Sequence, residues 1–158
     1  VDFRCVRYPG LISAETIPTG GTSDFVPEMV HAAARGEPYT CFVREDSRIP
    51  FMTMPEAISA TLQLAAVPRK ELTQIVYNIA SFSPSAGEVA ELVKYYFPKA
   101  VITFEPDQRR QAMVDSWPEA LNCKAAESDW GFKPTYTLAQ AFEKYLIPRI
   151  AKQYESAT

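Results

Sequence analysis

The sequence predicts an α/β fold in which at least part of the sheet is parallel. Strand-like and helix-like segments alternate from the amino end of the chain onward, a pattern typical of strands joined by helices. Two apolar segments, FRCVRY at residues 3–8 and QIVYNIA at residues 74–80, have the composition of buried strands. A parallel pair of this kind normally lies in a larger sheet that is covered on both faces. We therefore expect this chain to form the second half of a larger unit.

The first helix is predicted at residues 24–35. Asp24 or Ser23 can cap its start and Gly36 can end it. Apolar residues recur at helical spacing along one side of this segment. His31, the single histidine of the chain, lies off that apolar stripe. We expect it to face solvent and to take no part in catalysis.

The later elements follow from similar signals. Short strands are predicted at residues 39–43 and 101–104, with an extended segment after the charged turn in REDSRIPFMTM. Helices are predicted at residues 55–66, 85–97 and 118–127, and from residue 137 onward. Ser85 with Glu88, and Thr137 with Gln140, form two capping boxes. The rest of residues 105–134 is expected to be irregular.

Composition limits the class of function. The chain has 158 residues, with 47% hydrophobic and 22% charged residues, which is enough for one globular domain. A net charge of −3 without a basic cluster argues against a nucleic-acid partner, and no apolar run is long enough to cross a membrane. Cys5, Cys41 and Cys123 are far apart and match no metal-binding spacing. We expect Cys5 and Cys41 to be buried free thiols, and we predict no metal site.

Four motifs carry a resemblance to a known family. They are RYPGLISAETIPTGGTSDF at residues 7–25, MPEAISATLQL at residues 54–64, VYNIA at residues 76–80 and DSWP at residues 115–118. In this order they resemble the carboxyl-terminal part of an extended short-chain dehydrogenase/reductase of the NAD-dependent epimerase/dehydratase superfamily. The closest similarity is to the epimerase-like L-threonine 3-dehydrogenases. The resemblance implies a Rossmann-type α/β fold, to which this chain contributes two parallel strands and a small α+β substrate-binding region.

The resemblance also implies catalytic parts that this sequence does not contain. The family binds NAD at a glycine-rich turn and uses a Tyr-x-x-x-Lys pair as its catalytic machinery. Gly20–Gly21 does not follow a strand–turn unit, so it does not match the phosphate-binding turn. Tyr95 and Lys99 have the right spacing, but Pro98 ends the helix that such a pair would share. We therefore predict no catalytic residue here, an absent amino-terminal NAD-binding half, and a single substrate-binding domain at residues 1–158.

A cofactor contact is implied at the end of the first strand. Pro9, Gly10 and the backbone at Leu11 resemble the family's contact with the nicotinamide end of NAD. A glycine at a strand end lets the main chain approach a flat ring closely. The alternative is a simple turn that ends the strand. We expect NAD in the intact enzyme, without tight binding by this chain alone.

A substrate contact is implied by residues in three later motifs. Thr22 and Asp24 match positions that help to bind the amino-acid substrate and close the site, although Asp24 could simply be a helix cap. Trp117 resembles a residue lining the same pocket, or it could anchor the core. Arg48 is expected to form an ion pair with Glu45 or Asp46. Glu56 is expected to favour the macrodipole of its helix without a catalytic role, and DWGFKP at residues 129–134 to serve packing.

The resulting functional hypothesis is half of a dehydrogenase. The chain is interpreted as the substrate side of an NAD-dependent enzyme that converts L-threonine to 2-amino-3-ketobutyrate, inactive on its own. The alternatives are part of a nucleotide-sugar epimerase or dehydratase, and a non-catalytic assembly module. The unpaired edge of the first strand predicts self-association or pairing with the missing half. The family implies a cytoplasmic protein in bacteria and a mitochondrial one in animals.

Overall fold

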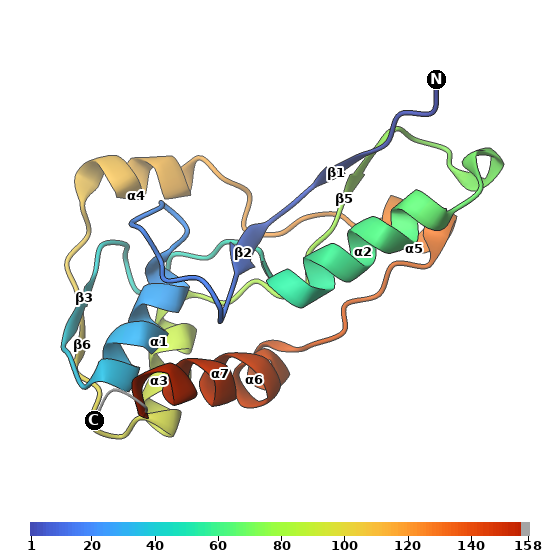
Figure 1. The fold of residues 1–158 in the computed structure, drawn as a ribbon. Coiled ribbons are helices and arrows are strands. Elements are labelled where there is room, and N and C mark those ends of the chain that lie inside the picture. The colour runs from blue at the N-terminus through green and yellow to red at the C-terminus, as the bar shows by residue number, and fades with distance from the viewer. Residues whose placement is uncertain (156–158) are drawn as a thin grey trace.

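The computed structural model describes residues 1–155 and contains three short parallel strand pairs among helices (Figure 1). The strands are β1 (Cys5–Arg7), β2 (Gly10–Ile12), β3 (Tyr39–Cys41), β4 (Phe51–Thr53), β5 (Val76–Asn78) and β6 (Ile102–Phe104). The pairs are β1–β5, β2–β4 and β3–β6. The parallel pairing predicted for the two apolar segments is confirmed, with Cys5 opposite Val76 and Arg7 opposite Asn78.

The helices surround these strand pairs. They are α1 (Phe25–Arg35), α2 (Met54–Ala66), α3 (Ala86–Tyr96), α4 (Gln108–Asp115), α5 (Lys124–Trp130), α6 (Leu138–Ala141) and α7 (Ile147–Glu155). A π-helical turn at Phe142–Leu146 joins α6 to α7, and a 3-10 turn lies at Arg69–Glu71. Both predicted capping boxes are present. Gly36 ends α1 with a φ of 71°, a left-handed conformation that glycine adopts without strain.

Two elements were not predicted, and one was misplaced. Helix α4 has no apolar stripe that a sequence pattern could detect. It is capped by Asp107, whose carboxylate accepts hydrogen bonds from the backbone amides of Arg109 and Arg110. Strand β2 is not expected from the sequence, because Pro9–Gly10 is typical of a turn that ends a strand. Pairing with β4 keeps residues 10–12 extended. The helix expected at residues 118–127 begins only at Lys124.

The prediction that His31 faces solvent was wrong. Only 1% of the residue is exposed, because α7 covers the side of α1 opposite the predicted stripe. The Tyr154 hydroxyl lies 2.8 Å from His31 Nδ1 and also accepts a hydrogen bond from Arg35. Burial, with a smaller effect of the Arg35 charge, lowers the pKa of His31. The apolar stripe accounts for one buried face of α1, and α7 buries a second face that includes His31.

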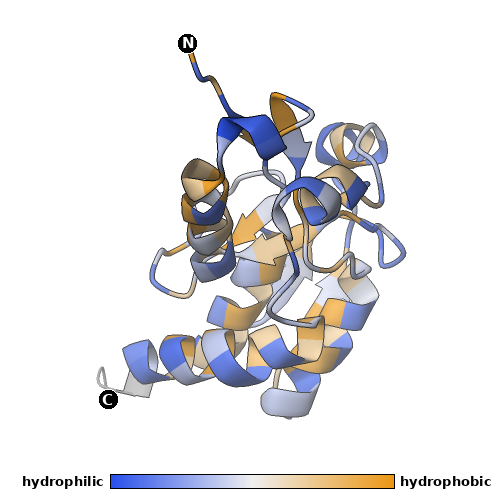
Figure 2. Ribbon diagram, turned by 90° about the vertical axis from the view of Figure 1, so that its right-hand side faces the viewer, coloured by the Kyte–Doolittle hydropathy of each residue, from blue (hydrophilic) through white to orange (hydrophobic). Residues whose placement is uncertain are grey.

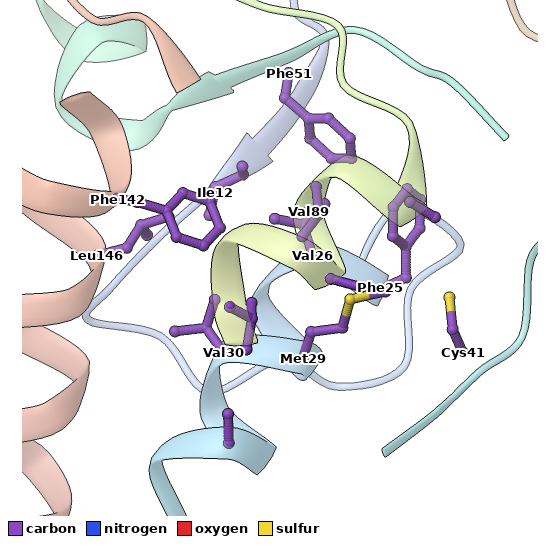
Figure 3. Packing of buried hydrophobic residues seen from close by; sticks show 14 of the residues in the cluster. Ile12, Phe25, Val26, Met29, Val30, Cys41, Phe51, Val89, Phe142 and Leu146 are labelled. Carbon is purple, nitrogen blue, oxygen red and sulfur yellow. The ribbon is translucent and has the colours of Figure 1, made fainter. Parts of the chain in front are cut away.

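The larger of two hydrophobic clusters is built around α1, α3 and the carboxyl-terminal helices. Figure 3 shows Phe142 and Leu146 pointing toward Ile12 and the side chains of α1 and α3. Phe25 at the start of α1 packs edge-to-face on Phe51, with the ring centroids 5.6 Å apart. This cluster is enclosed by helices from both ends of the described chain.

The smaller cluster lies between β1, β5, α2 and α5. Tyr77 and Trp130 meet edge-to-face at 6.0 Å, and Phe132 packs on Trp130. Trp130 and Phe132 are both buried, so the packing role predicted for DWGFKP is confirmed. The outer face of α2 stays uncovered: Ile58 is 54% and Leu62 is 67% exposed. In Figure 2 hydrophobic residues, coloured orange, occur along the helices as well as on the strands.

Glu56 joins the two regions. Only 5% of the residue is exposed, and its carboxylate accepts hydrogen bonds from the backbone amide and hydroxyl of Thr53 at 3.2 and 2.8 Å. It also accepts one from the Ser81 hydroxyl at 3.0 Å and from the backbone amides of Thr135 and Tyr136 at 2.8 and 3.0 Å. A buried carboxylate is tolerable where hydrogen bonds replace its water. Glu56 therefore ties α2 to the segments before α3 and α6.

The three cysteines are free, as expected. Cys41 is buried, whereas Cys5 and Cys123 are half-buried. Burial raises the pKa of the Cys41 thiol to about 11, which keeps it protonated and unreactive near neutral pH. Within residues 1–155, no group of three His, Cys, Asp or Glu side chains is arranged to hold a metal ion. None of the helices in this part of the chain is long and apolar enough to cross a membrane.

Candidate active-site pocket

A cavity of about 620 Å³ lies at the carboxyl ends of β1 and β5. Ligands of parallel α/β sheets typically bind at this end of the strands. The wall is formed by the turn at residues 7–10, Ser23 before α1, Ile49 and Pro50 before β4, Asn78 at the end of β5, and residues 117, 118 and 121. Segments that are far apart in the sequence thus meet at one site.

Pro9 and Gly10, two of the predicted cofactor residues, line this cavity. The backbone amide of Gly10 donates a hydrogen bond to the Pro50 carbonyl at 3.0 Å, which fixes the turn against β4. A Cβ atom at Gly10 would lie 2.7 Å from two ring carbons of Phe51. Glycine is therefore required at this position by packing, independently of any ligand.

Leu11 lies outside the cavity. Its side chain borders a separate apolar depression of about 310 Å³ on α2, together with Tyr8, Ile58 and Leu62. The alternation of β2 explains this placement, because neighbouring side chains of a strand point to opposite faces. The nicotinamide contact predicted at Leu11 concerns its backbone. The Leu11 side chain faces α2 and cannot contribute to the cavity.

Thr22 and Asp24 do not line the cavity, whereas Ser23 between them does. The Thr22 hydroxyl donates to the Met113 sulfur at 3.3 Å. Asp24 occupies the N-cap position of α1, but its side chain makes no cap hydrogen bond. Its carboxylate instead accepts hydrogen bonds from the backbone amides of Gly21 at 2.8 Å and Thr19 at 3.3 Å. In this state Asp24 organises the loop at residues 13–24.

Trp117 lines the cavity and is 37% exposed, so it is not the core anchor considered as the alternative. Its position is set by the end of α4, where its backbone amide donates to the Val114 carbonyl at 3.0 Å. Asp115, two residues earlier, forms two hydrogen bonds with the Arg44 guanidinium at 2.8 and 3.0 Å. Arg44 lowers the pKa of Asp115, with a smaller effect of its hydrogen bond to Gln111. These contacts hold the DSWP segment beside the cavity.

The expected partner of Arg48 was wrong. Arg48 forms its ion pair with Glu88 at 2.9 Å, in place of Glu45 or Asp46, and also donates a hydrogen bond to the Ser83 carbonyl. The turn directs the side chain across to the start of α3, where an antiparallel bridge joins residues 48 and 85. The side-chain hydrogen bond from Arg48, with a smaller effect of the Ser85 backbone amide, lowers the pKa of Glu88. Arg48 is thus occupied, and it does not line the cavity.

The sequence analysis missed several wall residues, above all Arg7 and Asn78. They stand opposite each other in the β1–β5 register and both line the cavity. Asn78 could have been found, because it ends a predicted parallel strand and ligands bind beyond such ends. Ile49, Pro50 and Leu121 had no comparable signal, since only the tertiary fold brings them to the site.

Comparison with known proteins gives a consistent family of relatives. No family model matches the chain. It is 36% identical over 140 residues to the mitochondrial L-threonine 3-dehydrogenase of Bos taurus, covering 89% of this chain and 38% of that protein. It is 34% identical to an uncharacterized epimerase/dehydratase of Staphylococcus saprophyticus, covering 95% of this chain and 47% of that protein. The chain therefore spans less than half of these relatives' length.

Solved structures agree. The GalE-like L-threonine dehydrogenase of Cupriavidus necator superposes with a TM-score of 0.89 at 43% identity, covering 94% of this chain and 53% of that one. The resemblance to the epimerase-like threonine dehydrogenases is confirmed. A UDP-glucuronic acid 4-epimerase of Bacillus cereus gives a TM-score of 0.71 at 16% identity, which supports the fold alone. The chain has the Rossmann-type α/β fold of these enzymes and corresponds to their carboxyl-terminal half.

Proposed function

We propose that residues 1–158 form the substrate-binding domain of an NAD-dependent L-threonine 3-dehydrogenase. The observation that carries this proposal is the cavity at the ends of β1 and β5. Pro9 and Gly10 of the RYPG motif and Trp117 of the DSWP motif all line it. The 43% identity to the Cupriavidus necator enzyme supports the same choice of substrate.

The cavity is suited to a flat ring and a small amino acid. Pro9, Ile49 and Pro50 provide apolar surface, and Asn78 and Ser23 provide hydrogen-bonding groups, the usual mixture in a small-molecule site. NAD, when bound, accepts a hydride from the substrate. The Gly20–Gly21 pair is a poor phosphate cradle, because a phosphate needs backbone amide donors and the Gly21 amide already donates to the Asp24 carboxylate. The cofactor's phosphates are therefore assigned to another part of the enzyme.

The residues of this chain would bind and orient the substrate. In the complete enzyme the turn at Pro9 and Gly10 would lie against the nicotinamide, and Trp117 would shield the substrate from water. The Thr22 hydroxyl and the Asp24 carboxylate, on either side of Ser23 in the chain, are proposed to bind the substrate ammonium group. Asp24 is the one carboxylate in this set and is assigned to that ammonium group, so none of these residues is left to take the proton of the threonine hydroxyl. We therefore assign the general base to an amino-terminal half and expect this chain alone to be inactive.

Completion by an amino-terminal half also accounts for the open face of α2. Ile58, Leu62, Leu11 and Tyr8 border an apolar depression at the surface, next to the unpaired edge of β1. A sheet edge and an apolar face that lie together favour association with another chain or segment. The companion is either the amino-terminal half or a second copy of this chain. The compartment stays a prediction, cytoplasmic in a bacterium and mitochondrial in an animal.

The proposal is tested by NAD reduction with L-threonine. The chain is assayed alone and after mixing with the amino-terminal half of the Cupriavidus necator enzyme. We expect activity only in the mixture, and we expect Thr22→Val to weaken it. Thr103→Val is the matched control, because Thr103 is exposed on β6 and bonds only to Thr40.

Two results would contradict the proposal. Activity of the chain alone would mean that it contains an unrecognised base. A stable complex of the two halves that does not oxidise L-threonine would make the substrate assignment wrong. Turnover of a nucleotide sugar by that complex would establish the epimerase alternative, which the staphylococcal relative favours.

A further inference from the structure

Arg110 on α4 holds the loop that carries Thr22 and Asp24. Its Nη2 atom donates hydrogen bonds to the Gly20 carbonyl at 3.1 Å and to the Gly21 carbonyl at 2.8 Å. The two partners are about ninety residues away in the sequence. In Figure 1 this loop lies against α4. The contact spans the exposed side of the molecule, beside the pocket.

The guanidinium group is itself fixed from the opposite side. Its central carbon lies 3.1 Å from the centroid of the Phe42 ring, and Phe42 is buried directly after β3. A cation on an aromatic face is stabilised by the ring's negative charge density. Phe42 therefore contacts one face of the guanidinium group, while a nitrogen at the edge of that group donates to the two glycine carbonyls.

The loop contacts interlock at Gly21. Arg110 binds the Gly21 carbonyl, and the Asp24 carboxylate binds the Gly21 amide at 2.8 Å. A second contact from the same helix is the hydrogen bond of the Thr22 hydroxyl to Met113. Helix α4 thus contacts the loop on both sides of Gly21, and the position of Thr22 depends on the position of this helix.

Helix α4 is itself fixed to the rest of the fold by side-chain hydrogen bonds. Gln111 is buried; its side-chain oxygen accepts from the Arg44 amide at 2.7 Å and its side-chain nitrogen donates to the Ser47 hydroxyl at 3.0 Å. Asp115 at the end of the helix is bound by the Arg44 side chain. The same helix end leads directly into Trp117. One rigid element therefore sets the loop at one side of the pocket and Trp117 at another.

We propose that Arg110 is a positioning residue for the substrate pocket. By holding the carbonyls of Gly20 and Gly21, it fixes Thr22, Ser23 and Asp24 at a set distance from Trp117. The claim that Arg110 affects substrate binding rests on the proposed function. The claim that Arg110 holds the loop does not. Lysine is a poor substitute, because a rounded ammonium group lacks the planar face that stacks on Phe42.

The first test measures hydrogen exchange of the full chain by mass spectrometry. In Arg110→Gln we expect the amides of residues 19–24 to exchange about tenfold faster or more, because hydrogen bonds from a charged donor are lost. Amides in α3 and β5 should keep their protection. Arg109→Gln is the matched control, since Arg109 is exposed on the same helix and only its backbone is bonded. Unchanged exchange of the loop in Arg110→Gln would overturn the proposal.

A second variant covers the case in which Arg110→Gln loosens the whole chain. Arg110→Lys keeps the charge and the aliphatic stem, and we expect faster exchange confined to residues 19–24. Equal acceleration in α3 and β5 would show a general structural role and overturn the proposal.

The third readout uses the mixture with the amino-terminal half. A positioning role predicts that Arg110→Lys raises the KM for L-threonine by a larger factor than it lowers kcat. A lower kcat with an unchanged KM would contradict it. If the unsubstituted mixture does not oxidise L-threonine, the proposed function fails, while the exchange result still decides whether Arg110 holds the loop.

Discussion

The two hydrophobic clusters of this chain differ in how completely they are covered. The larger one is enclosed by α1, α3 and the carboxyl-terminal helices, and its aromatic side chains Phe25, Phe51 and Phe142 are fully buried. The smaller one has a buried interior around Tyr77, but its α2 face presents Ile58 and Leu62 to solvent. Strands β1 and β5 of the smaller cluster also contribute Arg7 and Asn78 to the pocket, and α2 borders the separate apolar depression.

This difference indicates which part of the molecule is stable without a binding partner. An apolar cluster that is closed on all sides stabilises the fold without a partner, because its surface is already removed from water. An apolar face beside an unpaired strand edge gains stability only when something covers it. The larger cluster therefore stabilises the isolated chain, whereas the exposed apolar face of the smaller cluster is suited to contact a second polypeptide.

The largest effect is expected in the larger cluster. Phe142→Ala should lower the free energy of unfolding by about 3–5 kcal/mol, as is typical for removal of a buried aromatic ring. Leu62→Ala on the open face should change it by less than about 0.5 kcal/mol. Urea unfolding followed by circular dichroism measures both. Equal losses would mean that the α2 face is covered in solution even in the isolated chain.

The next effect concerns the link between the two regions. Glu56→Ala should lower the free energy of unfolding by about 3 kcal/mol, because Thr53, Ser81 and two backbone amides lose a charged acceptor. Glu91→Ala is the control, since Glu91 is exposed and pairs only with Lys94; such pairs contribute about 0–1 kcal/mol. Similar unfolding curves for the two variants would show that Glu56 is not the junction.

A smaller effect is expected from pH. The pKa of His31 is lowered in the folded state, so between that value and the ordinary value near 6.5 the unfolded chain binds a proton that the folded chain does not. Stability should therefore be complete above about pH 6.5 and decrease as the pH falls below it. Because His31 is the only histidine, His31→Gln should remove this dependence. Parallel profiles for both proteins between pH 7 and 5 would contradict the buried, neutral state.

The smallest effect on stability comes from a charge on the open face. Leu62→Glu should leave the unfolding curve of the isolated chain nearly unchanged, within about 0.5 kcal/mol, because the side chain is already in water. It should weaken association with an amino-terminal half, since a carboxylate would be buried at the contact. Val101→Glu is the control, because Val101 is also an exposed apolar residue but lies before β6, away from the depression on α2. Sedimentation of each variant with its partner gives the comparison.

Sequence reasoning succeeded where the determining interactions are local. The capping boxes at Ser85 and Thr137 and the glycine that ends α1 depend on residues within one helical turn. It failed where distant segments decide. His31 is buried by α7, which lies at the far end of the described chain, and helix α4 is held by Arg44 and Ser47 in place of an apolar stripe of its own.

The same distinction holds for the site. Pro9, Gly10 and Trp117, which line the cavity, were predicted because each belongs to a motif that resembles the family's. Asn78 was missed although its strand was predicted, because the strand end was not used as a guide. Arg110 carried no signal, since its two carbonyl partners are brought to it only by the folded chain.

The central claim is that the open face of the smaller cluster receives the amino-terminal half of a dehydrogenase. Light scattering after size-exclusion chromatography tests it most directly, with this chain, the Cupriavidus necator amino-terminal half, and their mixture. We predict a one-to-one complex in the mixture that Leu62→Glu disrupts and Val101→Glu does not. Separate elution of the two chains at every concentration, or a complex that is indifferent to Leu62→Glu, would contradict the account.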